Sequence, residues 1–218
     1  MRPVVIVILA AFAMLGQDPY QVAGDHYHLA FENTWVRATR VTYGPRETAP
    51  VHAHPATPTT VYVYVTNGGA MRFNHVTGER VAGVSINRRP VKAGAIRFAH
   101  GAPETHSVEY LGDAPTEYAR IELRTEPLDR PARDVRLAPA SFNYSGSDAI
   151  TQFENGQVRI LRVQCGIGQR CLESGHPNDP AVVVTMNGPD RGRIEWSPQL
   201  TVGPVELVRI ELKTKPVQ

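Results

Sequence analysis

The feature that most constrains the fold of this chain is an internal duplication. The segment FENTWVRATRVTYGPRETAPVHAHP, residues 31–55, aligns without a gap with FENGQVRILRVQCGIGQRCLESGHP, residues 153–177. The ends of the two copies also match, because EYARIELRTEP at 117–127 corresponds to ELVRIELKTKP at 206–216. Matches of this length indicate that one structural unit occurs twice. The 218 residues are enough for one large or two small domains.

The pattern of apolar residues predicts an all-β chain. Gly and Pro occur 18 times each, between many short runs rich in β-branched residues. Residues 61–65, VYVYV, alternate aliphatic and aromatic side chains, as in a strand that is buried on both faces or lines the mouth of a barrel. Long helical periodicity is absent. Small antiparallel barrels of the jelly-roll type fit these patterns, and the mouth of such a barrel can hold a small ligand.

The two copies differ in length, which predicts two unequal domains. The first copy has about 50 residues between Asn67 and Glu117, whereas the second has about 20 between the aligned Asn187 and Glu206. The second copy therefore keeps the scaffold and loses a hairpin. We expect a signal peptide, an N-terminal linker, a first domain, a second linker and a shortened second domain at 1–16, 17–30, 31–127, 128–141 and 142–218.

The N-terminus predicts an export signal. Arg2 precedes the short apolar run PVVIVILAAFAML, and small residues at 11–13 or Gly16 offer a cleavage site. This run is short for a spanning helix, and no later segment approaches the apolar length of a membrane span. An uncleaved membrane anchor and a buried N-terminal strand are the alternatives. We expect an exported protein, periplasmic or secreted, without an integral membrane span after cleavage.

His52 and His54 are the strongest candidates for metal ligands. They lie one residue apart before an alternating strand, and residues i and i+2 of a strand face the same side. His106 heads a later strand, beyond glycines at Gly94 and Gly101, and could supply a third ligand. Neutral imidazole nitrogens bind zinc, copper, nickel or iron, and three protein ligands leave positions open for water and substrate.

The His-x-His strand, the glycine-bounded hairpin and the later His-Ser-Val-Glu strand, all within residues 31–125, resemble the two sequence motifs of the cupin family. The resemblance implies tandem double-stranded β-helix barrels and one divalent transition metal ion (Fe, Mn, Ni, Cu or Zn), bound by His52, His54 and His106. The chain departs from the family pattern because it has no carboxylate at 58–61, where cupins usually carry a glutamate ligand. The second copy has Ser-Gly-His at the histidine pair, so we expect it to be degenerate and free of metal.

Weaker candidates surround the three histidines. His100 is an alternative third ligand or a base at the rim, and it is otherwise an exposed turn residue. Glu104 could be a fourth ligand or a general base, or a solvated loop charge. Tyr64 could direct its hydroxyl to a ligand, or pack as an aromatic side chain. His75 has no partner motif and stays unassigned.

Three arginines of the first copy recur in the second. Arg37, Arg40 and Arg120 align with the following residues: Arg159, Arg162 and Arg209. Because the second copy has kept these arginines but lost its histidine pair, we expect them to be structural.

Cys165 and Cys171 flank the Gly166 to Arg170 turn of the second copy. A pair of this kind in an exported chain usually oxidises, and a hairpin-like turn can bring the two Cα atoms within bonding range. The sequence therefore predicts a disulfide. A metal-binding pair is the alternative, but His176 adds only one further ligand.

Two classes of function fit the sequence. Similarity to three-histidine cupins implies an oxygen-dependent, dioxygenase-like enzyme that cleaves a small organic molecule. The alternative is a non-catalytic bicupin that binds a small ligand or has a structural role, and a homodimer is compatible with either. A formal charge of +2, without a basic run carrying interleaved aromatics, is too small to imply a nucleic-acid partner, and we expect none. The sequence also contains no nucleophile elbow, phosphate-binding loop or dinucleotide fingerprint.

Overall fold

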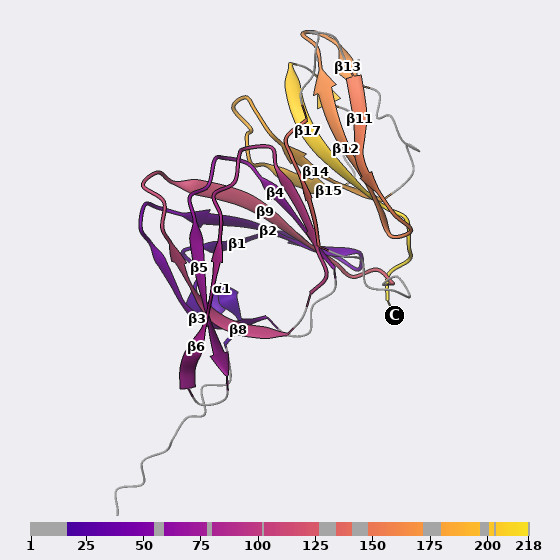
Figure 1. The fold of residues 1–218 in the computed structure, drawn as a ribbon. Helices are drawn as coiled ribbons and strands as arrows, with labels where there is room; N and C mark the ends of the chain where they lie inside the picture. Colours follow the sequence, from indigo (N-terminus) through magenta and orange to yellow (C-terminus); the bar gives the residue numbers. More distant parts are fainter. Residues whose placement is uncertain are drawn as a thin grey trace, which may run out of the picture.

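The computed structural model describes residues 17–54, 59–77, 80–101, 103–126, 134–140, 148–171, 180–196, 201–202 and 204–217. The predicted signal peptide and the Ser-Gly-His of the second copy lie outside these residues. Antiparallel strands dominate the described part, and its one helix, α1 (Pro19–Val22), is a single turn beside the first strands (Figure 1). No helix within these ranges is long and apolar enough to cross a membrane.

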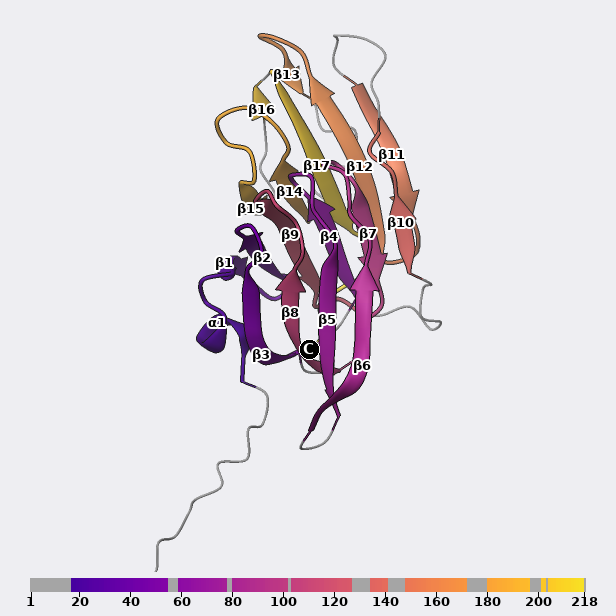
Figure 2. The same ribbon diagram turned by 60° about the vertical axis from the view of Figure 1, so that its left-hand side comes forward.

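The first copy of the repeat forms two antiparallel sheets that face each other. The six-stranded sheet has the order β1 (Tyr27–Glu32), β2 (Val36–Tyr43), β9 (Thr116–Leu123), β4 (Thr60–Tyr64), β7 (Ile96–Ala99) and β10 (Val135–Leu137). The four-stranded sheet has the order β3 (Thr48–His54), β8 (Glu104–Tyr110), β5 (Met71–Thr77) and β6 (Arg80–Arg88) (Figure 2). Apolar side chains of both sheets meet between them, which gives this unit the interior of a barrel.

The second copy repeats the first sheet and reduces the other. Its five-stranded sheet has the order β11 (Asp148–Glu154), β12 (Val158–Cys165), β17 (Val205–Leu212), β14 (Ala181–Thr185) and β15 (Ile194–Trp196). Only the pair β13 (Arg170–Cys171) and β16 (Thr201–Val202) stands, within the described residues, where the first unit has four strands. The all-β fold with a shortened second unit, predicted from the sequence, is confirmed.

The duplication is visible in the register of the strands. The β1–β2 pairing is irregular between Leu29 and Phe31, and the β11–β12 pairing is irregular between the aligned Thr151 and Phe153. The order β1-β2-β9-β4-β7 of the first unit corresponds to β11-β12-β17-β14-β15 of the second. The two units thus share one folding pattern down to a single bulge.

The two large sheets pack face to face and form the main core of the molecule. Val61 and Val63 of β4 are fully buried in one cluster with Val184 and Val208 of the second unit. Figure 1 shows the six-stranded sheet between the four-stranded sheet and the second unit. Residues 61–65 therefore lie in a strand with two covered faces, because the valines face the second unit and the tyrosines face the barrel.

Two segments expected to be linkers contribute secondary structure. The N-terminal segment 17–30 contains α1 and the start of β1. The segment 128–141 contains β10, which pairs with β7 at the edge of the six-stranded sheet. Both additions extend the first unit around the interior of its barrel.

Candidate metal centre

Three histidines meet in the interior of the first barrel. β3 and β8 are neighbours, and their register places His52 directly opposite His106. A shift in register between Ala49 and His52 precedes the pair, and His54 follows on the same face. One ring nitrogen from each histidine lies within 4.8 Å of the others, and all three side chains are buried. The structure brings together the three residues that the sequence singled out.

Hydrogen bonds fix the tautomer of His52. Its Nδ1 lies 2.7 Å from the carbonyl oxygen of Pro50, which can only accept, so Nδ1 carries the proton. Nε2 then keeps its lone pair, and the hydroxyl of Tyr27 lies 3.2 Å from it as the donor. A backbone carbonyl that holds one ring nitrogen is the usual way in which proteins orient the other toward a metal.

Burial keeps His52 and His54 in the neutral state. Burial lowers the pKa of His52 to about 4, with His106 and Arg120 contributing, although the hydrogen bond to Pro50 opposes the shift. Burial and the positive charge of Arg120 lower the pKa of His54 still further. At neutral pH these two imidazoles are therefore neutral, with one ring nitrogen free of a proton, which is the form that binds a metal ion.

Glu104 and His75 form a second group around His106. The Oε2 atom of Glu104 lies 3.4 Å from Nδ1 of His106 and 4.0 Å from Nδ1 of His75. Burial raises the pKa of Glu104, but its interactions with His106, Arg88 and His75 outweigh this effect and leave the pKa below its usual value. An ionised carboxylate at Nδ1 of a histidine can orient the ring for metal binding through Nε2.

The other two candidates, His100 and Tyr64, contribute no atom to the two groups of possible ligand atoms. His100 is exposed just after β7 and does not belong to either group of ligand atoms. Tyr64 packs against the ring of Tyr118, with ring centroids 5.7 Å apart, and lines a cavity beside Arg88 and Arg97. Burial raises the pKa of Tyr64, so its hydroxyl keeps its proton.

A cavity of about 280 Å³ opens beside His54. Its wall includes Arg120, Glu122 and Tyr20, and the Nη2 atom of Arg120 lies 3.0 Å from Oε1 of Glu122. Both members of this ion pair are buried. Arg120 was expected to be structural, yet it lies in the wall of the cavity beside His54.

Sequence reasoning missed Tyr27, His75 and Arg120. Tyr27 lies in a segment that reads as a polar linker, and His75 has no partner within its own strand. His75 and His106 come together only through the pairing of β5 with β8, which sets them opposite each other. Arg120 alternates with the apolar Ala119 and Ile121, and this alternation places Arg120 on the barrel face. The pattern is present in the sequence, but the recurrence of the arginine in both copies favoured a structural role.

No family model matches this sequence, and no curated protein matches it. Among solved structures, YhaK from Escherichia coli is 16% identical over 93% of this chain and 98% of its own, with a TM-score of 0.56. The bacterial pirin YhhW from Escherichia coli, solved with nickel(II), is 12% identical over 88% of this chain and 91% of its own, with a TM-score of 0.55.

A third similar structure is the oxalate decarboxylase of Bacillus subtilis, a protein with Mn(II) centres. It is 9% identical over 88% of this chain and 76% of its own, with a TM-score of 0.51. At identities this low, the comparisons show a shared fold only. The chain therefore has the two-barrel cupin fold, and the histidine triad in its first barrel fits a cupin metal site.

Proposed function

We propose that this protein is a metal-binding bicupin in which His52, His54 and His106 bind one divalent transition metal ion. The observation that carries the proposal is the triad itself, three buried histidines with ligand atoms within 4.8 Å of one another. Nickel in the pirin and manganese in the oxalate decarboxylase support a transition metal without choosing between Fe, Mn, Ni, Cu and Zn.

The triad, Glu104 and Arg120 have different roles in the proposed site. A bound divalent ion supplies a Lewis-acid centre for an oxygen ligand. The three ligands are neutral, so the triad leaves the full charge of such an ion uncompensated, which favours an anionic or enolizable ligand. Nδ1 of His106 is buried without a hydrogen bond within the described residues, and the carboxylate of Glu104, 3.4 Å away, would accept from it and leave Nε2 for the triad. Arg120, held by Glu122, presents a positive charge to the cavity beside His54.

The activity that we propose is oxygen-dependent, dioxygenase-like cleavage of a small organic molecule that enters through the cavity at His54. Glu104 is the base in this proposal, and Tyr64 is a hydroxyl donor to the ligand. A non-catalytic role in binding a small ligand is the second candidate. It is favoured because the triad contains no carboxylate and Glu104 is already engaged by two histidines.

Several further properties belong to the same proposal. We propose export directed by residues 1–16, a first domain at 31–127 and a second at 142–218, and a disulfide between Cys165 and Cys171. A homodimer is compatible with this proposal. The second unit would carry no metal and would stabilise the first barrel through the shared core.

Elemental analysis of the purified protein tests the metal site. We expect about one transition metal ion per chain. The His106→Ala variant should lose at least 10-fold in metal affinity, because loss of an outer-shell partner alone commonly costs 10- to 100-fold. His100→Ala is the matched control and should bind metal as the unaltered protein does. Two ions per chain, or metal lost from His100→Ala and kept by His106→Ala, would contradict the assignment.

Oxygen consumption separates the enzyme from the binding protein. Metal-loaded protein is incubated with a panel of small enolizable and aromatic compounds while dissolved oxygen is recorded. Consumption that depends on compound, metal and His52 supports the enzyme. Ligand binding by calorimetry without any oxygen uptake would support the non-catalytic role.

A further inference from the structure

A row of arginines crosses the barrel face of the six-stranded sheet. In the strand order β9-β4-β7-β10, Tyr62 pairs with Arg120 on one side and with Arg97 on the other, and Arg97 pairs with Arg136. Residues directly opposite one another on neighbouring strands point to the same face of a sheet. Three arginines and one tyrosine therefore form a single row across the sheet. Arg97 and Arg136 are directly opposite each other and carry like charges. Such a pair destabilises a sheet when no group of opposite charge lies between them.

The corresponding row of the second unit has different residues. In the corresponding strands β17-β14-β15, Val183 pairs with Arg209 on one side and with Glu195 on the other. An aliphatic residue thus replaces Tyr62, and an acidic residue replaces Arg97. The excess of positive charge is a property of the first unit and not of the shared fold.

The guanidinium group of Arg97 is only partly satisfied. Its Nη2 atom donates to Oδ2 of Asp134 at 2.6 Å, whereas Nε and Nη1 are buried and make no hydrogen bond within the described part of the chain. Arg88 approaches from the opposite sheet, with its Cζ atom 3.9 Å from the centre of the Phe73 ring. Buried N–H groups without an acceptor are costly, so an acceptor from a ligand would stabilise this arrangement.

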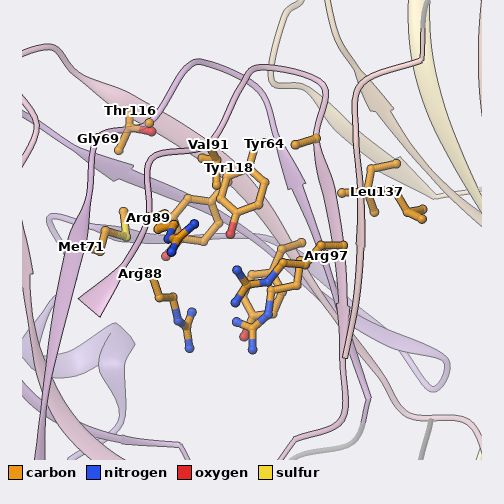
Figure 3. A pocket seen from close by; sticks show the side chains of 15 residues that line it. Tyr64, Gly69, Met71, Arg88, Arg89, Val91, Arg97, Thr116, Tyr118 and Leu137 are labelled. Carbon is orange, nitrogen blue, oxygen red and sulfur yellow. The ribbon is translucent and has the colours of Figure 1, made fainter. Parts of the chain in front are cut away.

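These side chains surround a cavity of about 80 Å³. Tyr64, Tyr118, Val91 and Leu137 form its apolar part, and none of its lining residues is acidic. Figure 3 shows Arg88 and Arg97 reaching toward the same opening, beside the rings of the tyrosines. The cavity combines a positive rim with an aromatic wall and little volume.

We propose that this cavity, the arginine cavity, binds the carboxylate of a small organic acid. A carboxylate accepts charge-assisted hydrogen bonds from guanidinium N–H groups, and Nη1 of Arg97, which has no acceptor within the described part of the chain, can donate one to it. Arg136 and Arg88 add charge, and the apolar body of the acid lies against Tyr64 and Tyr118. The inference goes beyond the proposed function because it needs no metal ion. The ring of Phe73, 5.2 Å from the ring of His106, separates Arg88 from the triad.

Calorimetric titration of the full chain tests the proposal. Benzoate and butyrate are added to metal-free and to metal-loaded protein at constant ionic strength, with benzamide as the uncharged comparison. We expect both acids to bind in both states and benzamide not to bind. Arg97→Gln should weaken binding by about 10-fold or more, as expected for a hydrogen bond to a charged group. Arg136→Gln should weaken it by about 2- to 5-fold, as expected for an exposed charge. Arg97→Lys, which keeps the charge but loses the planar guanidinium, should weaken it less than Arg97→Gln.

Arg46→Gln is the matched control, because Arg46 is an exposed arginine of the same unit that pairs with Asp113. It removes the same charge and should leave binding unchanged. Equal losses in Arg46→Gln and Arg136→Gln, phosphate bound as tightly as benzoate, or binding only to metal-loaded protein would overturn the proposal. Because Arg136 is exposed, its variant tests the site even if Arg97→Gln fails to fold. Metal content measured on the same samples keeps this result separate from the fate of the metal site.

Discussion

At the scale of single residues, the metal centre is prepared by contacts that the metal would have to change. His52 donates through Nδ1 to Pro50 and accepts through Nε2 from Tyr27. The first hydrogen bond orients the ring, whereas the second occupies the lone pair that a metal ion would use. The hydroxyl of Tyr27 would therefore compete with a metal ion for Nε2 of His52.

The Tyr27→Phe variant tests this competition. A neutral hydrogen bond contributes about 1 kcal/mol, so its removal should tighten metal binding by about 2- to 5-fold. Competition titration with a chelator measures the change. His52→Ala is the opposite control and should weaken binding by at least 10-fold. Weaker metal binding by Tyr27→Phe would show that the hydroxyl supports the site rather than blocking it.

The buried histidines also predict the pH dependence of the metal-free protein. The pKa of His52 falls from 6.5 to about 4 on folding, so the unfolded chain binds more protons between these values. The stabilisation is complete above pH 6.5 and is lost as the pH falls to about 4, a total of about 3 kcal/mol from this residue. His54 acts in the same direction.

Urea unfolding in the presence of a chelator, at about pH 7.5 and about pH 4.5, measures this slope. In His52→Asn the difference between the two pH values should shrink. His28→Asn removes an exposed histidine and should leave the difference unchanged. An unchanged difference in His52→Asn would contradict the assignment.

At the scale of elements, one asparagine turn is used twice. The side-chain oxygen of Asn33 accepts from the backbone N–H groups of Trp35 and Val36, and that of Asn155 accepts from Gln157 and Val158, with distances of 2.8 to 3.0 Å. Each turn closes the hairpin that leads into a strand of the shared core. The repeat has thus preserved a specific backbone contact as well as a hydrophobic pattern.

Replacement of either asparagine should be similarly costly. Asn33→Ala and Asn155→Ala each lose two hydrogen bonds, so each should lower the free energy of unfolding by about 1 to 3 kcal/mol. Chemical denaturation measures the loss. Asn33→Asp keeps the acceptor oxygen and should retain most of the stability, whereas an equal loss in Asn33→Asp would show that the acceptor is not the reason.

The turn between β12 and β13 carries the predicted disulfide. Cys165 is the last residue of β12, and Cys171 ends β13, whose side chains lie outside the described part. The bond stays a prediction, with a stabilisation of roughly 2 kcal/mol because the closed loop is short. Titration of the unreduced mature protein should find no free thiol. Two reactive thiols per chain would remove the disulfide and weaken the case for export.

At the scale of the whole molecule, the second unit covers an apolar face of the first. Residues of β4 and β9 are fully buried against β14 and β17. Each square ångström of apolar surface removed from water contributes about 25 cal/mol, so the shared core ties the stability of the metal barrel to its partner.

A charge placed in this core should disrupt both units. Val208 is fully buried, and Val208→Asp should cost several kcal/mol, because an unpaired carboxylate would lose its hydration. Ile167→Asp is the matched control at a turn position that is 85% exposed, and it should change stability by less than about 0.5 kcal/mol. Thermal unfolding compares them. A chain that ends after Asp129 and still folds and binds metal would contradict the stabilising role.

The sequence alone determined the features that repeat along the chain. Alternating apolar residues predicted the strands, and the duplicated segments predicted two related units. The missing hairpin predicted that the second unit is shorter. These features can be read from the sequence because strand periodicity and repeats are properties of the chain order itself. The pairing of His52 with His54 was also visible, since both lie in one strand. His106 could be reached through the spacing of the motif.

Only the tertiary structure decided which distant residues share a face. Tyr27 reaches His52 through β1, His75 reaches His106 through the pairing of β5 with β8, and Arg136 reaches Arg97 because β10 adds to the edge of the sheet. These contacts depend on strand order and register, which are set by packing between segments far apart in the chain. A histidine or arginine without a local pattern therefore acquires its surroundings only when the sheets close around the barrel.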